Sequence, residues 1–429
     1  MSFHQRLQEI REGFEPAFWV ANITELFERL SYYGVQAVLA IYLSETLRFS
    51  EAKTGDLIGY FGLIVWFLPI FGGTLADRFG FRRSLAFAYL VLGVGYFMLG
   101  SLSAPWMAPI RNIMPLERFV LLVLLVPAVG PAIVKPCVVG TTARASSENV
   151  RSLGYSIYYT IVNVGGTLGP FVAFLVRRSL GIENVFRVCA ISVFLMFFAT
   201  LIFYKEPTRS GEAQVTSIAA AFKNMLIVLG NFRFMLFLLI FSGFWVVFWQ
   251  EFISLPLYIR GYVNPNADVD LLLTVDPLAV IVLQIVVSYL TRRIPTFPAM
   301  TLGLLVTSLS WLILGYGSPA WMVRGLPVWG AVTLVVLALG EMIQSPRYYE
   351  YISRLAPPGQ QGTFMGYAFL PIGIGFFIAG AIGGRLVHYF GEVLHRPQQM
   401  WWVISAIGVF ATLLMVIYDR IVKPAPASA

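Results

Sequence analysis

Uncharged apolar runs of about 20 residues recur along the whole 429-residue chain, and this feature limits the fold more than any other. A helix needs about 20 apolar residues to cross the hydrocarbon core of a bilayer. Charged residues make up only 12% of the chain, whereas soluble domains usually carry about 25%. A soluble chain of this length could not cover itself with so little polar surface. The sequence therefore predicts an all-α membrane protein.

The apolar runs predict twelve transmembrane helices in two pseudo-symmetric halves. The first six are expected at about 17–43, 55–76, 84–104, 116–142, 153–176 and 184–204. The second six are expected at about 232–259, 271–291, 298–317, 326–354, 362–388 and 399–421. A polar stretch and a following amphipathic piece separate the two sets. We therefore expect an N-terminal six-helix half (1–204), a cytoplasmic linker (205–231) and a C-terminal six-helix half (232–429).

The distribution of Lys and Arg predicts the orientation. Basic residues are in excess in the loops on the side that carries both termini, and such an excess marks the cytoplasmic side. The polar segment from Met1 to Glu15 lacks the apolar core of a cleavable signal peptide, so the first long helix is expected to act as the insertion signal. Short loops favour a bacterial inner membrane. The protein is expected there as a multi-pass monomer with both termini in the cytoplasm.

Composition also bears on several other functions. The net charge is +8, but the basic residues stand at helix ends, so they indicate topology and not nucleic-acid binding. Cys137 and Cys189 lie in apolar runs and are interpreted as packing thiols. The histidines show no metal-ligand spacing, and no Ser/His or Asp/Asp pair stands out on a helix. We expect no enzyme, no metal and no cofactor, with protons as the only coupling ion.

The loop between the second and third predicted spans carries a charged glycine-containing signature. It resembles the GxxxDRxGxRR signature of the major facilitator superfamily, at Gly73, Asp77, Arg78, Gly80, Arg82 and Arg83. Glycine lets helix backbones approach closely, and Asp77 can pair with an arginine or cap a neighbouring helix. Such a latch would hold the cytoplasmic side shut in one state, so Asp77, Arg78, Arg82 and Arg83 are candidate gating residues. The alternative is an ordinary basic stop-transfer loop.

The first predicted span contains three charges at bilayer depth, where charged groups are costly and are usually kept for function. Glu25 and Arg29 are four residues apart and can pair on one helix face, with Glu28 beside them. Tyr32 and Tyr33 follow one turn later. Two carboxylates next to one guanidinium make a site that can hold a proton. The alternative is a static ion-pair network that locks the helix.

Here the sequence resembles the proton-dependent oligopeptide transporter family of the same superfamily. Glu25-xx-Glu28-Arg29 followed by Tyr32-Tyr33-Gly34 is similar to that family's ExxER motif. Further stretches match in the same order: Lys135-Pro136, Tyr155 to Gly166 (close to FSIYYxxxNxG), Phe244-Trp245 with Gln250-Glu251, Gly340-Glu341 with Ser345-Pro346, Leu355-Ala356-Pro357, Gln361-Gly362-Thr363 and Met365-Gly366. The resemblance covers both halves, and it is specific in combination.

The resemblance implies roles for individual residues. The proton-coupling set would be Glu25, Glu28, Arg29, Lys135 and Glu251. The substrate-binding set would be Arg29, Tyr33, Trp66, Lys135, Tyr159, Asn163, Glu341 and Ala368, with the site between the two halves near the midplane.

The chemistry of these residues suits an amphoteric substrate. A short peptide is a zwitterion, whose carboxylate would be bound by basic side chains such as Arg29 and Lys135. A carboxylate, Glu341, would bind the ammonium group. Protonating a glutamate would release its cationic partner for the substrate, which couples proton and substrate occupancy. The expected function is a proton-coupled symporter that imports di- and tripeptide-like solutes by alternating access.

Some positions depart from the family pattern. Trp66 stands where a pocket tyrosine is expected, Ala368 where a tryptophan is usual, and Leu30 where an aromatic residue is common. Trp66 and Ala368 either exchange bulk across the pocket or mark a changed substrate.

Two further departures introduce charge. Asp276-Pro277 replaces asparagine-proline. Arg347 and Glu350 add an i, i+3 charge pair. This pair is either structural or a gate contact that breaks in one state.

Two other functions remain open at this stage. A transporter of the same fold could export drugs or move an organic anion, although Glu341 argues against a purely anionic substrate. A membrane sensor could bind the solute without moving it, and bulk uptake into liposomes would separate that from a carrier. The expected partners are a small-molecule substrate, protons and the lipid bilayer.

Overall fold

The computed structural model describes residues 13–69, 78–207, 226, 228–317, 321–323, 326–355 and 361–422. Within these ranges nearly all regular structure is helical. The exception is a two-residue antiparallel pair, β1 (Met322–Val323) with β2 (Leu326–Pro327). The predicted all-α membrane fold is confirmed. Asp77 and most of the linker predicted at 205–231 lie outside the described residues.

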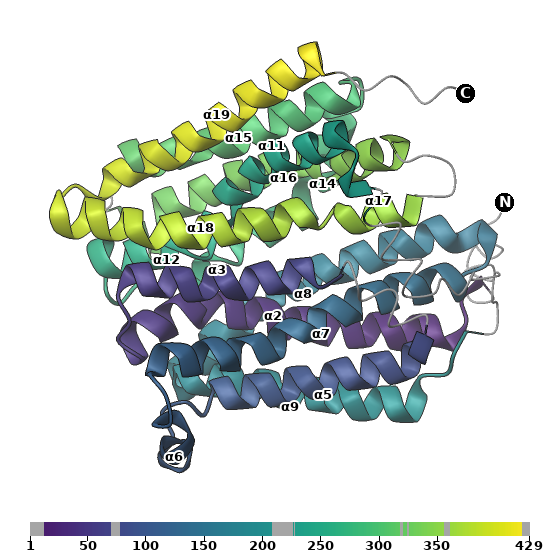
Figure 1. The fold of residues 1–429 in the computed structure, drawn as a ribbon, viewed down its shortest axis with the longest axis horizontal. Helices are drawn as coiled ribbons and strands as arrows, with labels where there is room; N and C mark the ends of the chain where they lie inside the picture. Colours follow the sequence, from purple (N-terminus) through teal and green to yellow (C-terminus); the bar gives the residue numbers. More distant parts are fainter. Residues whose placement is uncertain are drawn as a thin grey trace. The chain divides into compact units, whose positions relative to one another are not determined.

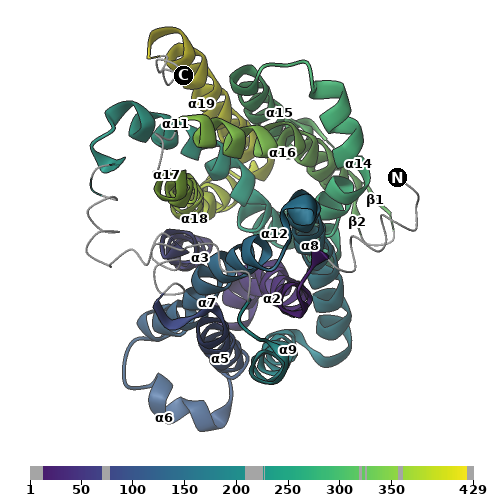
Figure 2. The same ribbon diagram turned by 90° about the vertical axis from the view of Figure 1, so that its right-hand side faces the viewer.

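The chain forms two compact units, which are described separately here. Unit 1 comprises Met1–Val35 and Leu68–Ile218, and unit 2 comprises Gln36–Phe67 and Ala219–Ala429. Unit 1 contains most of α2 (Pro16–Ile41) together with α5 (Phe81–Leu99), η2 (Pro105–Met107), α6 (Ala108–Arg111), α7 (Leu116–Arg144), η3 (Glu148–Val150), α8 (Arg151–Leu180) and α9 (Ile182–Phe203). In this unit α5 packs against both α7 and α9 (Figure 2).

Unit 2 takes in the end of α2 and begins with two elements from the first third of the chain, η1 (Tyr42–Thr46) and α3 (Glu51–Phe67). Its other elements are α11 (Phe232–Phe248), η4 (Trp249–Glu251), α12 (Ser254–Tyr258), η5 (Ile259–Val263), α13 (Val269–Leu272), α14 (Val275–Thr291), α15 (Thr296–Tyr316), α16 (Val328–Leu355), α17 (Gln361–Tyr367), α18 (Leu370–His388), η6 (Tyr389–Val393), η7 (Pro397–Gln399) and α19 (Met400–Ile421). The strongest packing joins α15 to α16 and α3 to α18.

Nine helical stretches in the described part of the chain are long and apolar enough to cross a membrane. The other three predicted spans correspond to α2, α3 and α5. Of these, α2 carries three charges within its middle turns, and α3 is only 17 residues long. The described helices are therefore consistent with twelve spans.

Backbone contact between α3 and α18 explains why residues 36–67 group with the second half of the sequence. A Cβ atom at Gly55 would collide with the carbonyl oxygen of Gly380, and one at Gly384 would collide with that of Glu51. At Gly59 it would lie 2.9 Å from the carbonyl oxygen of Phe377. Small residues on both faces permit this approach, and Figure 1 shows the two helices side by side. The pseudo-symmetric halves stay a prediction.

Two ion pairs join η1 and α3 to later elements of unit 2. Arg260 donates two hydrogen bonds to Glu45, at 2.8 and 2.7 Å. Arg385 of α18 donates two to Asp56 of α3, at 2.6 and 2.9 Å. Two parallel bonds fix the relative geometry of the paired groups. These pairs set the register between the early segment and the later helices of unit 2.

Three predicted spans of unit 2 are interrupted. The span Phe232–Val263 breaks at η4, which ends with Glu251. The span Val269–Thr291 breaks between α13 and α14, so Asp276 lies in the first turn of α14. The span Phe364–Val393 breaks between α17 and α18, next to Ala368. In transporters, discontinuous membrane helices typically form substrate and ion sites.

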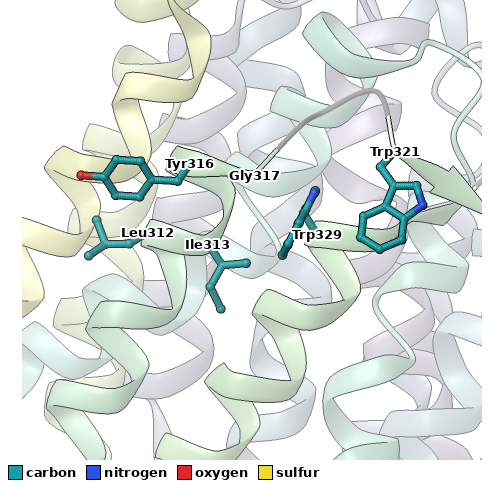
Figure 3. Close-up of a pocket in the computed structure, with 6 residues that line it drawn as sticks. All are labelled: Leu312, Ile313, Tyr316, Gly317, Trp321 and Trp329. Atoms are coloured by element: carbon teal, nitrogen blue, oxygen red, sulfur yellow. The ribbon is translucent and has the colours of Figure 1, made fainter.

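An open aromatic pocket of about 660 Å³ lies where α15 ends and α16 begins (Figure 3). Its lining includes Tyr316, Trp321 and Trp329. Tyr316 is 77% exposed and Trp321 is 53% exposed. Aromatic rings at the end of a span are typical of the membrane–water interface. None of the predicted site residues lines this pocket.

Candidate functional site

The charges of α2 form a compact buried cluster. Arg29 Nε lies 2.5 Å from Glu28 Oε2, and Arg29 Nη2 lies 2.8 Å from Glu28 Oε1. Arg29 Nε is 3.4 Å from Glu25 Oε1. The side chains are 0–1% exposed. One guanidinium thus serves two carboxylates, with Glu28 held by two hydrogen bonds and Glu25 by a longer contact.

The carboxylate of Glu25 is the less satisfied of the two. Neither of its oxygens has a hydrogen-bond partner among the described residues. A buried carboxylate without hydrogen bonds is costly as an anion and favours binding a proton or approaching a cation. The role of the cluster in proton coupling stays a prediction.

The close approach of α8 to α2 brings the two helices together at Arg29. A Cβ atom at Gly165 would lie 2.6 Å from Arg29 Cβ, and one at Gly169 would lie 2.9 Å from the backbone nitrogen of Gly34. On the other side, the Arg29 guanidinium lies over the Tyr32 ring, 5.0 Å from its centroid. The glycines in the tyrosine-rich stretch of α8 therefore position the charged segment of α2.

Lys135 of α7 belongs to the same cluster. It interacts electrostatically with Glu25, Glu28 and Arg29. Pro136 follows it inside α7 and removes a backbone hydrogen bond from the helix at this depth. The structure thus brings together four predicted coupling residues in unit 1, two acidic and two basic.

Two tyrosines of α5 were missed by the sequence reasoning. Tyr89 and Tyr96 are 0% and 1% exposed, and both interact electrostatically with glutamates of α2. They are seven residues apart, so they occupy one face of α5. This spacing of two tyrosines within an apolar span was the signal that could have found them.

The predicted substrate residues of unit 1 on α8 are more accessible. Tyr159 is 44% exposed, and Asn163 Nδ2 donates a hydrogen bond of 2.9 Å to the carbonyl oxygen of Tyr159. Tyr33 of α2 packs edge-on against Tyr32, with ring centroids 5.4 Å apart. Tyr159 and Asn163 therefore place polar side chains one turn apart on α8.

Unit 2 gathers carboxylates instead. Glu251 is 0% exposed, and neither carboxylate oxygen has a hydrogen-bond partner among the described residues. It interacts electrostatically with Asp276 and Glu341. Glu341, which lies on α16, also interacts with Tyr349. Asp276 was noted in the sequence only as a departure from the family pattern, and the structure adds it to the site residues.

Trp66 and Ala368 belong to an aromatic region of unit 2. The Trp66 ring lies 6.1 Å from Trp249 and 6.1 Å from Phe369, the latter in a stacked arrangement. Ala368 is fully buried, and its carbonyl oxygen accepts a 2.7 Å hydrogen bond from Tyr348. The large ring at position 66 thus stacks on Phe369, the residue next to Ala368. Whether the two positions exchange bulk or mark a changed substrate stays a prediction.

The predicted cytoplasmic latch is described in part. The backbone N–H of Arg82 donates a 2.8 Å hydrogen bond to Glu206 Oε1, and the Arg82 guanidinium donates to the carbonyl oxygen of Leu201. Gly80, at φ 82°, precedes α5 in a conformation that favours glycine. Arg78 and Arg83 are exposed. Arg82 therefore ties the start of α5 to the end of α9.

Arg347 and Glu350 form a local network on α16. Arg347 Nη1 lies 3.1 Å from Glu350 Oε2, and Arg354 Nη2 lies 2.6 Å from Glu350 Oε1. The three side chains are 24%, 30% and 68% exposed. All partners lie within two turns of one helix, which supports the structural interpretation of this pair.

Among the described residues, no group of His, Cys, Asp and Glu could hold a metal ion.

Comparisons with known proteins agree with this architecture. The family model of the Major Facilitator Superfamily matches residues 22–370 and 252–429. A Na⁺, Li⁺, K⁺/H⁺ antiporter of Planococcus maritimus is 24% identical, over 93% of this chain and 94% of the antiporter. The multidrug resistance protein MdtH of Escherichia coli O157:H7 is 22% identical, over 90% of each chain. Dipeptide and tripeptide permease B of Photorhabdus asymbiotica is 25% identical over 51% of this chain and 43% of the permease.

Solved structures show the same fold. A peptide transporter POT in complex with sulfate has a TM-score of 0.73 and 20% identity, covering 95% of this chain and 94% of the transporter. A mutant of the nucleoside transporter NupG has a TM-score of 0.77 and 12% identity, covering 94% of this chain and 99% of the transporter. At these identities the likeness concerns the fold alone.

Proposed function

Because the chain belongs to the major facilitator superfamily, whose members are transporters and not enzymes, we propose that it is a proton-coupled symporter. It imports di- and tripeptide-like solutes by alternating access and belongs to the proton-dependent oligopeptide transporters. It works in the inner membrane as a monomer with both termini in the cytoplasm.

The buried cluster of α2 is the observation that carries this proposal. Glu28 holds Arg29 by two hydrogen bonds. Protonation removes the charge that makes such a pair strong, so a proton on Glu28 releases the guanidinium. The free guanidinium then binds an anionic group. Proton binding and substrate binding are coupled in this way, since each changes the affinity for the other.

A zwitterionic substrate needs partners of both charges. Arg29 and Lys135 would bind the substrate carboxylate, and Glu341 would bind the ammonium group. Tyr33 and Asn163 would bind peptide amides through their polar groups. Broad acceptance of short peptides follows, because none of these contacts involves the side chains of the peptide.

Cation or drug export in exchange for protons is the second candidate. The antiporter and the multidrug resistance protein are matched over nearly their whole lengths, whereas the match to the permease covers about half of this chain. The buried carboxylates of unit 2 would suit a cationic substrate. This candidate predicts the opposite direction of solute movement relative to the proton gradient.

Uptake by the purified protein in liposomes tests the two directions. We expect radiolabelled Ala-Ala to accumulate when the external medium is more acidic than the lumen, and not when the gradient is reversed. Accumulation of an organic cation only in acid-loaded liposomes would favour exchange and overturn the symport proposal. Ligand binding without accumulation under either gradient would indicate a sensor.

Thermal stabilisation of the purified protein tests the substrate class separately. A ligand that binds only the folded state raises its stability by mass action. We expect di- and tripeptides to raise the unfolding temperature, and Glu341→Ala to remove the shift. Stabilisation by amino acids, organic anions or drugs but not by peptides would contradict the proposed substrate.

A further inference from the structure

Three carboxylates from three different segments of unit 2 lie within electrostatic reach of one another. Glu251 interacts with both Asp276 and Glu341, and Asp276 interacts with Glu341. The electrostatic partners of Glu251 are thus both acidic. Unit 1 differs, because its two buried glutamates share one arginine and a nearby lysine.

Packing between α14 and α16 supports this placement. Val280 and Val287 on α14 pack in one cluster with Ala338 and Met342 on α16. Asp276 lies four residues before Val280, on the same face of α14. Glu341 lies three residues after Ala338, on the same face of α16. The two carboxylates are therefore carried by the faces through which α14 and α16 meet, in line with the neighbouring helices in Figure 2.

The carboxylates also lack hydrogen-bond donors. Both oxygens of Glu251, and Oδ1 of Asp276, have no hydrogen-bond partner among the described residues. Glu251 is 0% exposed and Asp276 is 6% exposed. Both lie at interruptions of their spans, at η4 and in the first turn of α14. A carboxylate buried in such a position is stable as an anion only beside a positive partner.

We propose that Asp276, with Glu251 and Glu341, forms an acidic site that selects solutes with two cationic groups. This inference rests on the proposed function, and it specifies the substrate as a peptide with a lysine- or arginine-type side chain. The first ammonium group is bound by Glu341. The second cationic group is bound by Asp276, because one carboxylate balances only one positive charge.

The alternative of a metal cation is weaker on the geometry. These carboxylates are not grouped as a metal-binding set among the described residues. A flexible organic cation needs no tight coordination shell, since two ammonium groups several bonds apart can each approach one carboxylate. The spread of the three acids over three segments suits such a ligand.

Binding of matched peptides tests the proposal. The quantities to measure are the dissociation constants of Ala-Ala and Ala-Lys with the full-length protein in detergent. The unmodified protein should bind Ala-Lys about tenfold more tightly, as expected for one charge-assisted hydrogen bond. Asp276→Asn, which keeps the size, should weaken the binding of Ala-Lys, leave the binding of Ala-Ala largely unchanged and so remove most of the tenfold ratio. Asp276→Glu, which keeps the charge, should preserve a ratio above one.

Asp270→Asn is the matched control, because Asp270 is also buried and lies on the same span. For this variant, the ratio of the dissociation constants of Ala-Ala and Ala-Lys should equal that of the unmodified protein. Equal affinity of the unmodified protein for both peptides would overturn the proposal. So would a ratio that survives Asp276→Asn, or one that falls equally in Asp270→Asn.

Failure of the proposed function is distinguishable from failure of this inference. If neither peptide binds, the peptide assignment is wrong. The same proteins are then measured with 1,4-diaminobutane and 1-aminobutane. A preference for the diamine that depends on Asp276 would retain the acidic site, and equal binding of both amines would reject it.

Discussion

Arg29 binds Glu28 more closely than Glu25, and we expect the two glutamates to have different roles. Glu28 accepts two short hydrogen bonds, whereas Glu25 has only a 3.4 Å contact. Protonating Glu28 therefore weakens more of the contacts that hold the Arg29 guanidinium than protonating Glu25 does. The proton that couples transport is expected on Glu28.

Glu28→Gln should abolish proton-driven accumulation of peptide, because the amide cannot exchange a proton. Counterflow exchange should continue, since it needs no net proton movement. Both are measured in liposomes with labelled peptide. Glu148→Gln, at an exposed position of the same unit, is the control and should behave as the unmodified protein. Undiminished uphill uptake by Glu28→Gln would contradict the coupling role.

Lys135→Ala should abolish proton-driven uptake, because it removes a positive charge that interacts with both glutamates of α2. The uptake rate in liposomes under an inward proton gradient is the measurement. Lys53→Ala removes a lysine at an exposed position and serves as the charge-matched control. Normal uptake by Lys135→Ala would remove the basis for comparing this cluster with peptide transporters.

At this scale the sequence predicted the α2 part of the unit 1 cluster because Glu25, Glu28 and Arg29 are close along one helix, whereas Lys135 followed only from the family resemblance. Glu25 and Arg29 are one turn apart, and helix geometry alone places them together. The acidic set of unit 2 was predicted only in part. Glu251, Asp276 and Glu341 come from three helices, and the sequence does not specify how helices that are distant in the chain pack.

Among the elements, α3 and α18 make the closest backbone approach in unit 2. Overpacking a close contact usually costs about 1–3 kcal/mol. We expect Gly55→Ala to destabilise the protein by about this amount and to lower its thermal-unfolding midpoint, because the added methyl group collides with Gly380.

Gly366→Ala is the control for this prediction, since nothing lies within 4 Å of its added Cβ atom. In a helix this change should be neutral or stabilising by about 0.4–1 kcal/mol. Equal midpoints for Gly55→Ala and Gly366→Ala would show that the α3–α18 contact relaxes without loss of stability.

Asp56→Asn should lower the free energy of unfolding less than Gly55→Ala does, because partly exposed ion pairs contribute about 0–1 kcal/mol.

The positions of the helices were predictable, and their interruptions were not. The predicted spans 232–259, 271–291 and 362–388 each contain a break. Apolar residues continue through these breaks, so hydropathy gives no sign of them. Phe248 and Phe252, for example, flank η4 as apolar residues would in a continuous helix. The local backbone there depends on tertiary packing.

Across the whole molecule, the orientation remains a prediction that labelling can test. Cys137 and Cys189 are buried, so an introduced cysteine reports on its own position. Ile113→Cys, at a residue 74% exposed between α6 and α7, should react with an impermeant maleimide in intact cells. Ser428→Cys should react only in inverted vesicles. The reverse pattern would overturn the assignment of cytoplasmic termini.

The membrane class followed from composition and from the apolar runs, but the grouping of segments into units did not. The count of twelve spans stays a prediction, with which the described helices are consistent. Residues 36–67 belong to the second unit, although they lie within the first predicted half. The sequence shows glycines such as Gly55 and Gly384, but it does not show which helices they bring together. Charge counts likewise predict the sides of the membrane without specifying contacts.

The internal pairing of α2 bears on biosynthesis. The ribosome makes α2 before α7, so the helix meets the translocon before Lys135 exists. An unpaired charge at the centre of an inserting helix costs about 2.5–3.5 kcal/mol. Arg29 and Glu28 are neighbours in the chain, so their ion pair travels with the helix and lowers this cost at the moment of insertion. Lys135 arrives later with α7 and adds a second positive charge beside the two glutamates, so α2 is inserted with one fewer positive charge near these glutamates than the folded protein has.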